Sequence, residues 1–419
     1  MGNIIKVQKG TKDILPDEMP IWHLMEENAN RIFSNAGYGE LRTPIFEATE
    51  LFARGVGDTT DIVNKEMYTF EKSERSLTLR PENTAGVVRS FIENGMHRLS
   101  APVKLWYKGP MFRYERPQAG RQRQFHQVGV EMFGIKDATA DAEVIELAVS
   151  YLKSLGLNDL DVEINSLGCP ICREEYKTKI KEVLKPYFND LCEDCQNRYE
   201  KNPLRLLDCK VESCKSIFEK PEVKEVIQGD FICPECHEHF EQLKSYLDAL
   251  NIKYSVNKLL VRGLDYYNRT VFEVKSNNLG SQNAVCGGGR YDSLVRNLGG
   301  VDTPAIGFAM GMERLYSLIS NIEKEKLDAY VVSTDKVESL KLVKLLRDAN
   351  ISVDFDFNAK KFTKQMEKAS KVAKFAIILG EDEINSGMVS IKNLFTSEQT
   401  KIDRNDVVNY FNYFMIYKN

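Results

Sequence analysis

Basic residues crowd one short stretch of the chain, residues 111–134, which reads MFRYERPQAGRQRQFHQVGVEMFG. Arg113 and Arg116 lie on the first of two runs with strand character, and Arg121 and Arg123 lie on the loop that joins them. Arginine binds phosphate and carboxylate groups through a planar, bidentate fork. Several arginines spread over separate strands would therefore suit a polyphosphate that is held at several points.

The second run of this stretch alternates in character with the two-residue period of a strand. Its apolar face, from Val128 to Met132, is expected to pack on a core. Its other face carries Gln127 and Glu131 with a glycine between them. If the first run pairs antiparallel to the second, Arg113 joins this polar face. A solvated sheet face remains the alternative, since antiparallel sheets often expose one side to water.

Further polar groups fall on or beside other predicted strands: Thr78, Arg80 and Glu82; Arg262, Asp265, Tyr266 and Tyr267; and Glu313 with Arg314. Carboxylates among arginines suit an amine or imidazole, so the set predicts a site for a nucleoside triphosphate and a small cationic zwitterion. No GxxxxGK[ST] sequence is present, and ATP would bind the antiparallel sheet itself. Two alternatives stay open: Arg80 as a buried ion-pair partner, and one of the two tyrosines as core.

The elements that must position these residues suggest an α+β domain with a mostly antiparallel sheet, formed by residues 1–168 and 251–320. Helices are expected at 17–37 and 83–95, and strands at 67–70, 76–81, 104–116, 124–134, 258–274 and 284–295. Residues 169–250 are predicted to be a helical, cysteine-rich insertion. After a charged linker at 321–326, strands and helices alternate over 327–419, which predicts a small α/β domain with a largely parallel sheet.

Composition describes an ordinary globular protein of 419 residues, with 42% hydrophobic and 28% charged residues. The net charge of −4 argues against a generally basic nucleic-acid coat but allows a local basic patch. The chain has no long uncharged apolar run and its start has no apolar secretion signal, so a cytoplasmic location without membrane contact is expected.

Eight of the nine cysteines fall between residues 169 and 236: Cys169, Cys172, Cys192, Cys195, Cys209, Cys214, Cys233 and Cys236. Without a secretion signal, paired cysteines favour metal or free thiols over disulfides. Repeated CxxC is the spacing of tetrahedral zinc sites. The sequence leaves open two four-cysteine sites, one site plus spare thiols, or no metal.

Six lysines lie within about 140° of one predicted helix face: Lys360, Lys361, Lys364, Lys368, Lys371 and Lys374. Such a face is often only solvated surface. Nucleic-acid phosphates are the functional alternative, because they give salt-dependent affinity for lysine clusters.

Several segments together resemble class II aminoacyl-tRNA synthetases. FRYERPQAGRQRQFHQVGVE resembles their motif 2, PAIGFAMGMERL their motif 3, and GYGELRTPIFE their motif 1. VRGLDYY and AVCGGGRYD are similar to two signature peptides of the histidyl-tRNA synthetase family, bacterial type, and KGTKDILPDE and the domain after residue 326 match it too. The resemblance covers nearly the whole chain. It implies the class II synthetase fold for the first domain, anticodon binding for the last, and a homodimer.

The resemblance also implies the reaction and the partners. L-Histidine would attack the α-phosphate of ATP, giving histidyl-adenylate and pyrophosphate, and histidine would then pass to the 3′ end of tRNA-His. Arg113 and Arg262 would hold the reacting phosphate and the histidine carboxylate. Arg314 would hold the γ-phosphate with help from Arg121, Phe125 would serve as a platform for ATP, and Mg²⁺ would accompany the phosphates.

For the amino acid, the resemblance implies that Thr78, Glu82 and Gln127 bind the α-amine, and that Glu131 and Tyr267, beside Tyr266, bind the imidazole. Contacts with tRNA are expected from Arg121 and Arg123 and from the lysine face: Lys360, Lys364, Lys368 and Lys371. One residue departs from the family pattern, because Asn83 follows LRPE where glycine is usual; an asparagine can cap the next helix.

Two other functions compete with the ligase. A regulatory subunit of ATP phosphoribosyltransferase would share the catalytic core, but it typically lacks the anticodon domain and has eroded signatures. Here VRGLDYY, Arg113, Arg314 and the domain at 327–419 are all present. A zinc-dependent RNA-binding module would leave the arginine clusters unexplained. The sequence therefore favours the ligase.

Overall fold

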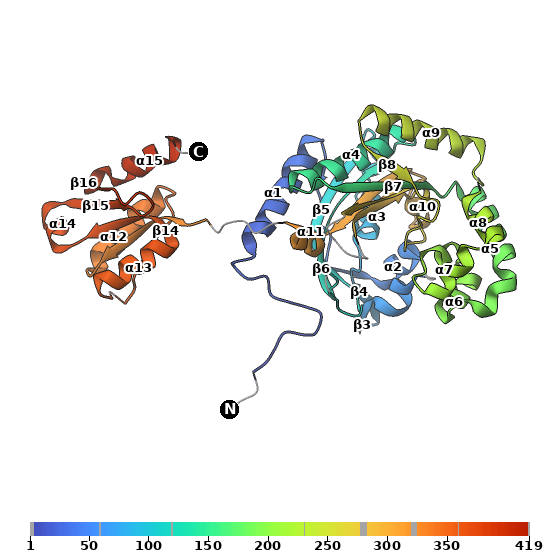
Figure 1. The fold of residues 1–419 in the computed structure, drawn as a ribbon, viewed down its shortest axis with the longest axis horizontal. Coiled ribbons are helices and arrows are strands. Elements are labelled where there is room, and N and C mark those ends of the chain that lie inside the picture. The colour runs from blue at the N-terminus through green and yellow to red at the C-terminus, as the bar shows by residue number, and fades with distance from the viewer. Residues whose placement is uncertain are drawn as a thin grey trace. The chain divides into compact units, whose positions relative to one another are not determined.

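The computed structural model describes residues 4–57, 60–118, 120–229, 231–276, 283–319, 325–358 and 360–417 (Figure 1). The chain forms two compact units, Met1–Ile322 and Glu323–Asn419. Of the predicted linker at 321–326, only residues 325 and 326 lie within the described part.

The N-terminal unit is built on an eight-stranded sheet. In spatial order its strands are β1 (Gly39–Glu40), β5 (Val103–Phe112), β6 (Gln124–Phe133), β11 (Ala305–Gly311), β10 (Ala284–Arg290), β9 (Asn268–Ser276), β7 (Leu160–Ser166) and β8 (Tyr254–Val256). Only the outer pairs, β1 with β5 and β7 with β8, are parallel. The prediction of a mostly antiparallel sheet is confirmed, and β5 and β6 pair as expected.

Helices cover one face of this sheet, and the main hydrophobic core lies between them and the sheet. They are α1 (Met19–Asn35), α4 (Ala138–Ser154) and α9 (Pro234–Ala249). The predicted apolar face of β6 lies in this core, because Val128, Val130 and Met132 are all buried within it. The opposite face of β6 is thereby directed away from the core, as the alternation predicted.

The other face of the sheet meets α3 (Thr84–Glu93) and a second apolar cluster that includes Phe91, Phe133 and Tyr291. The predicted strand pair at 67–81 forms, as β3 (Tyr68–Lys72) and β4 (Arg75–Leu79), but it lies outside the main sheet. With β2 (Phe46–Ala48) it makes a separate three-stranded sheet. Outside the insertion, the unit also contains five short helical segments: α2 (Thr49–Val56), Ile62–Glu66, Met96–Arg98, α10 (Leu294–Asn297) and α11 (Met312–Leu318).

The insertion is helical, as predicted, in its described part. It contains α5 (Pro170–Leu184), α6 (Glu193–Lys201), α7 (Glu212–Phe218) and α8 (Pro221–Gln228), with 3₁₀ turns at Lys185–Asp190 and Pro203–Asp208, and it ends in α9. Its own small core includes Ile180, Leu184, Leu206 and Val223. The helices α5 to α8 lie together beside the sheet, whereas α9 runs back along α4 (Figure 1).

The C-terminal unit has a five-stranded sheet: β13 (Val353–Phe355), β12 (Leu327–Ser333), β14 (Ala373–Leu379), β15 (Met388–Asn393) and β16 (Gln399–Asp403). Its helices are α12 (Lys336–Asp348), α13 (Phe362–Val372), α14 (Glu381–Ser386) and α15 (Val407–Tyr417), with a 3₁₀ turn at Arg404–Asp406.

The sheet of this unit is mixed, so the prediction of a largely parallel sheet was wrong for its second half. The first three strands are parallel, but β15 and β16 are antiparallel to their neighbours. A parallel crossover needs about a dozen residues or more, and the short connection from β14 to β15 holds only α14. In the described residues of both units, no helix is long and apolar enough to cross a bilayer.

Candidate active site

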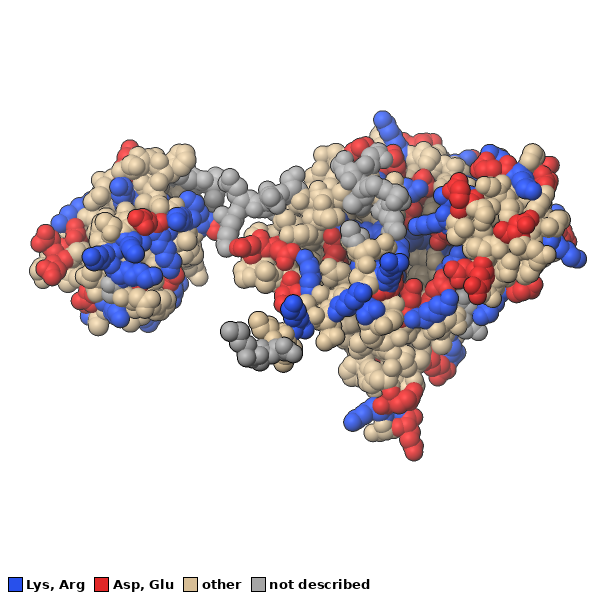
Figure 2. Space-filling view, turned by 60° about the horizontal axis from the view of Figure 1, so that its bottom comes forward, with Lys and Arg blue, Asp and Glu red and all other residues tan. Residues whose placement is uncertain are grey.

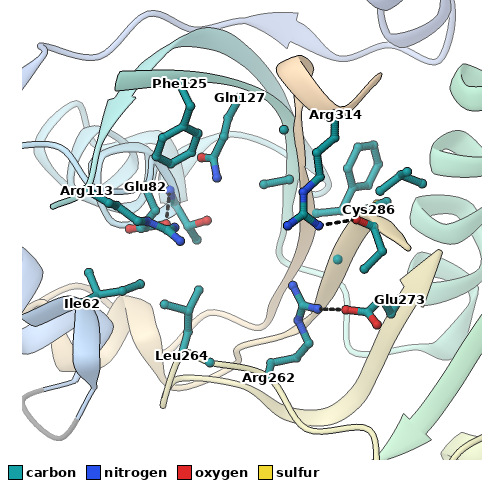
Figure 3. Close-up of a pocket in the computed structure, with 18 of the residues that line it drawn as sticks. Ile62, Glu82, Arg113, Phe125, Gln127, Arg262, Leu264, Glu273, Cys286 and Arg314 are labelled. Carbon is teal, nitrogen blue, oxygen red and sulfur yellow. Dashed lines mark hydrogen bonds and ion pairs between the residues drawn. The ribbon is translucent and has the colours of Figure 1, made fainter. Parts of the chain in front are cut away.

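A cavity of about 540 Å³ opens on the face of the sheet away from the α1, α4 and α9 core. Its walls come from β6, β9, β10 and β11, from Arg113, Glu115 and residues 120–122, from residues 261–264, 266 and 267, and from the insertion at Asp208 and Lys210. Its size matches typical small-molecule sites. Figure 3 shows charged side chains facing this cavity from several elements far apart in the sequence.

Three predicted arginines meet in the cavity, and each is braced by a different element (Figure 3). Arg113 follows β5, and its Nε donates to the carbonyl of Pro81 at 2.8 Å. Arg262 donates to Glu273 Oε1 at 2.6 Å. Arg314 Nη1 donates to the carbonyl of Ala284, also at 2.6 Å. These hydrogen bonds hold the three guanidinium groups in position before any ligand binds.

The cationic part of the cavity carries repulsion between like charges. Burial lowers the pKa of Arg314, and the nearby positive charge of Arg121 lowers it further. The Arg262 guanidinium lies against Gly287, where an added Cβ would stand 1.9 Å from Nη2. Only glycine leaves room for the guanidinium there. A polyphosphate would relieve the repulsion between the arginines.

The acidic part of the cavity centres on Glu131, whose side chain is 1% exposed. Its carboxylate accepts hydrogen bonds from Thr84 Oγ1 at 2.8 Å and from the hydroxyl of Tyr291. Burial raises the pKa of Glu131 to about 8, although both hydrogen bonds oppose the rise. At Gly307 an added Cβ would lie 1.8 Å from Glu131 Oε2, so glycine is required for this packing.

Glu82 is also buried in the cavity wall, and it caps α3. Its carboxylate accepts from the backbone amides of Thr84 at 2.7 Å and Ala85 at 2.9 Å. Burial raises the pKa of Glu82. Asn83 is the N-cap residue of α3, as expected, but its side chain does not cap the helix, because its amide oxygen accepts from the hydroxyl of Thr43 and from Arg80.

Other predicted ligands also reach the cavity. Gln127 and Phe125 lie on β6 beside Arg113 (Figure 3). Gln127 Oε1 is buried without a partner among the described residues. Tyr266 and Tyr267 both line the cavity, with ring centroids 4.6 Å apart. Both are also buried in the second apolar cluster, so the expected packing is present. The expectation that they lie on a strand was wrong, since β9 begins only at Asn268.

Some predicted residues lie elsewhere. Thr78 does not line the cavity: it is fully buried in the small sheet, with its hydroxyl 2.9 Å from those of Thr49 and Thr69. Arg123 does not line it either, and stacks over the ring of Tyr114 at 3.8 Å. Arg80 donates to the carbonyl of Pro110, which indicates a structural role.

Several site residues were missed from the sequence, among them Glu115 and Glu273 as well as the next two. Thr84 and Tyr291 line the cavity and both donate to Glu131. Tyr291 had a signal in its position two residues after the glycine run at 287–289, whereas Thr84 had none beyond its place at the start of a helix. Glu313, by contrast, is largely engaged by the backbone amide and ring of His126, which tie α11 to β6.

The lysine set of the C-terminal unit is exposed, but it does not form one helix face. Lys364, Lys368 and Lys371 lie on α13, Lys360 and Lys361 precede the helix, and Lys374 lies on β14. Lys374 pairs with Asp328 at 3.0 Å. Basic side chains gather on the face of this unit shown in Figure 2. A patch therefore exists, with three of the six lysines on the helix.

The eight clustered cysteines form two groups, which we name the outer tetrad (Cys169, Cys172, Cys233 and Cys236) and the inner tetrad (Cys192, Cys195, Cys209 and Cys214). Within each tetrad, all four Sγ atoms lie within 4.8 Å of one another. Representative Sγ–Sγ distances are 3.5 Å between Cys169 and Cys172 and 3.8 Å between Cys192 and Cys209. Between one site with spare thiols and two four-cysteine groups, the structure favours two groups.

Comparisons with known proteins agree with this site. A family model described as histidyl-tRNA synthetase matches residues 10–170 and 222–315, and one described as anticodon binding domain matches residues 328–412. A histidine–tRNA ligase of Caldanaerobacter subterraneus is 48% identical over 410 residues, which is 95% of this chain and 97% of the relative. One of Acetivibrio thermocellus is 48% identical over 97% of this chain and 99% of the relative.

Among solved structures, apo histidyl-tRNA synthetase of S. aureus superposes with a TM-score of 0.81 at 37% identity, over 97% of this chain and all of that one. A structure named as an ATP phosphoribosyltransferase regulatory subunit/histidyl-tRNA synthetase from Bacillus halodurans shares the fold at 20% identity, with a TM-score of 0.65 over 91% of this chain and all of that one. Fold, cavity and full-length relatives agree, and the chain belongs to the histidyl-tRNA synthetase family.

Proposed function

We propose that this protein activates L-histidine with ATP and transfers it to the 3′ end of tRNA-His, and that the cavity on the sheet is where activation takes place. The observation that carries the proposal is that the lining of the cavity has two chemically different parts, the arginines Arg113, Arg262 and Arg314 and the buried carboxyl groups of Glu82 and Glu131. The reaction joins a triphosphate to an amino acid with a basic ring, and these two parts match those two substrates.

On the ATP side, the arginines would stabilise negative charge where it develops. Arg113 lies 5.3 Å from the Phe125 ring centroid, so cation and ring form one platform. The guanidinium groups are held by Pro81, Glu273 and Ala284. Because these forks need no reorganisation during the reaction, they are suited to stabilise the α-phosphoryl transition state as pyrophosphate leaves. In this assignment Arg113 and Arg262 touch the reacting group, and Arg314 and Arg121 hold the outer phosphates.

On the amino-acid side, Glu131 would accept a hydrogen bond from the imidazole, with Tyr267 beside it. Glu82 and Gln127 would bind the α-amine, and Gln127 Oε1 is a buried acceptor that such an amine would satisfy. We assign Thr84, rather than Thr78, to this side because it lines the cavity. An amino acid without matching ring nitrogens would bury Glu131 further without adding a hydrogen bond to those from Thr84 and Tyr291, and this rejects it.

Mg²⁺ fits the cavity because Glu115 and Glu273 line it and offer the hard oxygen ligands that Mg²⁺ prefers. With ATP bound, these carboxylates and the phosphates would hold the ion, which supplies charge neutralisation. The residues of the chain then orient the two substrates against each other.

The tRNA would be bound at two places. Arg121, which lies on the loop after β5 and lines the cavity, would meet the acceptor end. The lysines of the C-terminal unit, including Lys360, Lys364, Lys368 and Lys371, would bind phosphates around the anticodon. Ile45 and Phe46 in the motif 1 segment are 45% and 53% exposed, which supports a homodimer contact there. The same proposal includes the predicted cytoplasmic location.

The regulatory-subunit alternative has weaker support. The solved structure that carries this name is similar at a level that shows the fold alone. The full-length relatives at 48% identity carry the ligase name.

The test is ATP–pyrophosphate exchange with each of the twenty amino acids, in the wild type and in Arg262→Ala. We expect exchange with histidine alone and a loss of about 10²–10³-fold in the variant, the usual effect of removing one transition-state donor. Circular dichroism and urea unfolding of both proteins control for folding. Folded wild-type protein with no exchange for any amino acid would contradict the ligase.

A further inference from the structure

We propose that each cysteine tetrad binds one Zn²⁺, and that the two ions fix the insertion against the active-site cavity. The family match leaves residues 171–221 unmatched, and these contain the whole inner tetrad and Cys172 of the outer tetrad. The proposal rests on the arrangement of the sulfurs, on the donors around them, and on the contacts that neighbouring residues make with the cavity.

The spacing of the sulfurs fits a tetrahedral ion. Zinc–thiolate bonds of about 2.3 Å place the four sulfurs of a tetrahedral site about 3.8 Å apart. The Sγ–Sγ distances of 3.5 Å and 3.8 Å lie near this value, and all six distances in each tetrad stay within 4.8 Å. A cluster of several irons would hold its four cysteine sulfurs further apart, so a single ion fits better.

Helix starts bring the cysteines of each pair together. Cys169, Cys192 and Cys233 are the N-cap residues of α5, α6 and α9, and each partner lies three residues on, at the first turn. Cys214 has the corresponding place in α7, with Cys209 in the turn before it. Two elements distant in sequence thus contribute one pair each to every tetrad.

Backbone amides point at the sulfurs, as they do around thiolate ligands. In the outer tetrad the contacts are reciprocal: the amide of Cys169 donates to Cys236 Sγ at 3.2 Å, and that of Cys233 donates to Cys172 Sγ at 3.1 Å. In the inner tetrad the amide of Cys192 donates to Cys214 Sγ at 3.3 Å. Free thiols need no such donors, whereas anionic sulfur ligands are stabilised by them.

The insertion also gains from a metal because of its size. Its core consists of short helices and 3₁₀ turns around a small apolar cluster, and Cys195, Cys209 and Cys214 are part of that cluster. Small cores are commonly reinforced by a structural metal. The outer tetrad joins the first helix of the insertion to the last, and the inner tetrad lies between them in sequence. The ion in the outer tetrad would link the first and last helices of the insertion, and the ion in the inner tetrad would stabilise its small core.

Residues next to each tetrad in the sequence contact the cavity or the segment at 261–267 that lines it. Arg173, which follows Cys172, donates to the carbonyls of Asp265 at 2.8 Å and Tyr267 at 3.0 Å. Asp208 and Lys210 flank Cys209 and line the cavity. At Gly168, two residues after β7 and with φ +70°, an added Cβ would lie 2.5 Å from Cys172 Cβ, so the outer tetrad packs against the backbone that follows this strand. An ion in the outer tetrad would therefore position the loop that carries Tyr267.

Metal content is the first test, and it does not depend on the proposed function. Full-length protein, purified without a polyhistidine tag, is analysed for zinc and iron by mass spectrometry. We expect two zinc ions per chain, one in Cys172→Ser/Cys236→Ser, one in Cys195→Ser/Cys214→Ser, and two in the matched control Cys286→Ser.

Two further measurements guard against variants that do not fold. Wild-type protein refolded with Co²⁺ should show the visible absorption of tetrahedral cobalt thiolates, and native protein should leave eight thiols protected from Ellman's reagent until metal is chelated. Metal-free folded protein with reactive thiols or with disulfides would overturn the proposal. Stoichiometric iron would overturn the assignment to zinc.

The link to the cavity, which rests on the proposed function, is tested by the KM for histidine in pyrophosphate exchange. We expect about a tenfold rise in the outer-tetrad variant, as misplaced binding groups cause, with a smaller change in kcat. Arg173→Ala should retain two zinc ions and show a similar rise. Wild-type KM values in both would overturn the link while leaving the zinc count intact. A wild type without exchange would instead contradict the ligase, again without changing the zinc count.

Discussion

The sheet side of the cavity and the insertion side hold their residues in different ways. Gln127 and Glu131 lie on β6, which is hydrogen-bonded to β5 on one edge and β11 on the other, above the main core. Asp208 and Lys210 are exposed and lie between short helical segments beside the inner tetrad. Residues on the sheet are positioned by the fold itself, whereas those on the insertion depend on a small, separately reinforced core. We therefore expect large effects from the first side and modest ones from the second.

The largest effect should follow Glu131→Gln. The amide keeps the shape, but its NH₂ group would face one of the two donors, Thr84 and Tyr291, and it cannot ionise when the histidine ring binds. A buried mismatched group costs about 1–3 kcal/mol. We expect kcat/KM for histidine activation to fall on the order of 10²-fold or more. If kcat/KM of the variant stayed within threefold of the wild-type value, Glu131 would not bind histidine, and the expected difference between the two sides of the cavity would be lost.

The same variant should reveal the cost of burying Glu131. Its pKa is raised to about 8 in the folded protein from an ordinary 4.5. The folded state thus holds a proton that the unfolded state releases, and stability falls as pH rises from about 4.5 to about 8. Glu131→Gln lacks this loss, so its advantage in unfolding free energy should grow between pH 5 and pH 8, by urea unfolding without substrates. A constant or shrinking difference would contradict the assignment.

A matched pair of threonines sharpens the comparison within the N-terminal unit. Thr84→Val removes the hydrogen bond to Glu131, worth about 1–1.5 kcal/mol, and should lower histidine activation about tenfold. Thr78→Val removes hydroxyl contacts in the small sheet and should lower the unfolding free energy by about 1 kcal/mol while changing activation less than twofold. Equal kinetic effects would mean that the cavity wall is misassigned.

On the insertion side, Lys210→Ala should lower histidine activation by only two- to fivefold. The side chain lines the cavity but is exposed, and solvated charges contribute about 0.2–1 kcal/mol. The effect should diminish further in 0.5 M salt, measured by exchange kinetics. A salt-resistant loss as large as that of Glu131→Gln would erase the distinction between the two sides.

The smallest effect on activation should come from the C-terminal unit. The triple change Lys364→Ala, Lys368→Ala and Lys371→Ala removes exposed charges from α13, so pyrophosphate exchange should stay at the wild-type rate. Aminoacylation should need more tRNA, and the salt dependence of tRNA binding should weaken by a slope of about 2–3. An unchanged salt slope would leave the lysines as plain surface.

How far the sequence predicted this arrangement depends on how regular each segment is. The face of β6 followed from a two-residue period that a sheet with neighbours on both edges enforces. Tyr266 and Tyr267 escaped that reasoning because their segment is an irregular turn. Thr78 was included because the family resemblance implied that it binds the α-amine, but it lies on β4, which belongs to the small sheet.

The contacts between segments distant in the sequence could not be predicted, for a different reason. Four pairs of cysteines allow many groupings, and only the folded insertion decides which pairs meet. The strand direction in the second half of the C-terminal sheet depended on a connection too short for a crossover. The partner of Asn83 depended on Thr43, which is forty residues away along the chain.

Glu82 performs two tasks whose combination has a consequence for dynamics. Its carboxylate closes the first turn of α3 through the amides of Thr84 and Ala85 while it faces the cavity. Any ligand amine that draws on this carboxylate must share it with those two amides. The hydrogen-exchange rates of these two amides should therefore change when an amino acid binds, and they would show whether this part of the site is occupied.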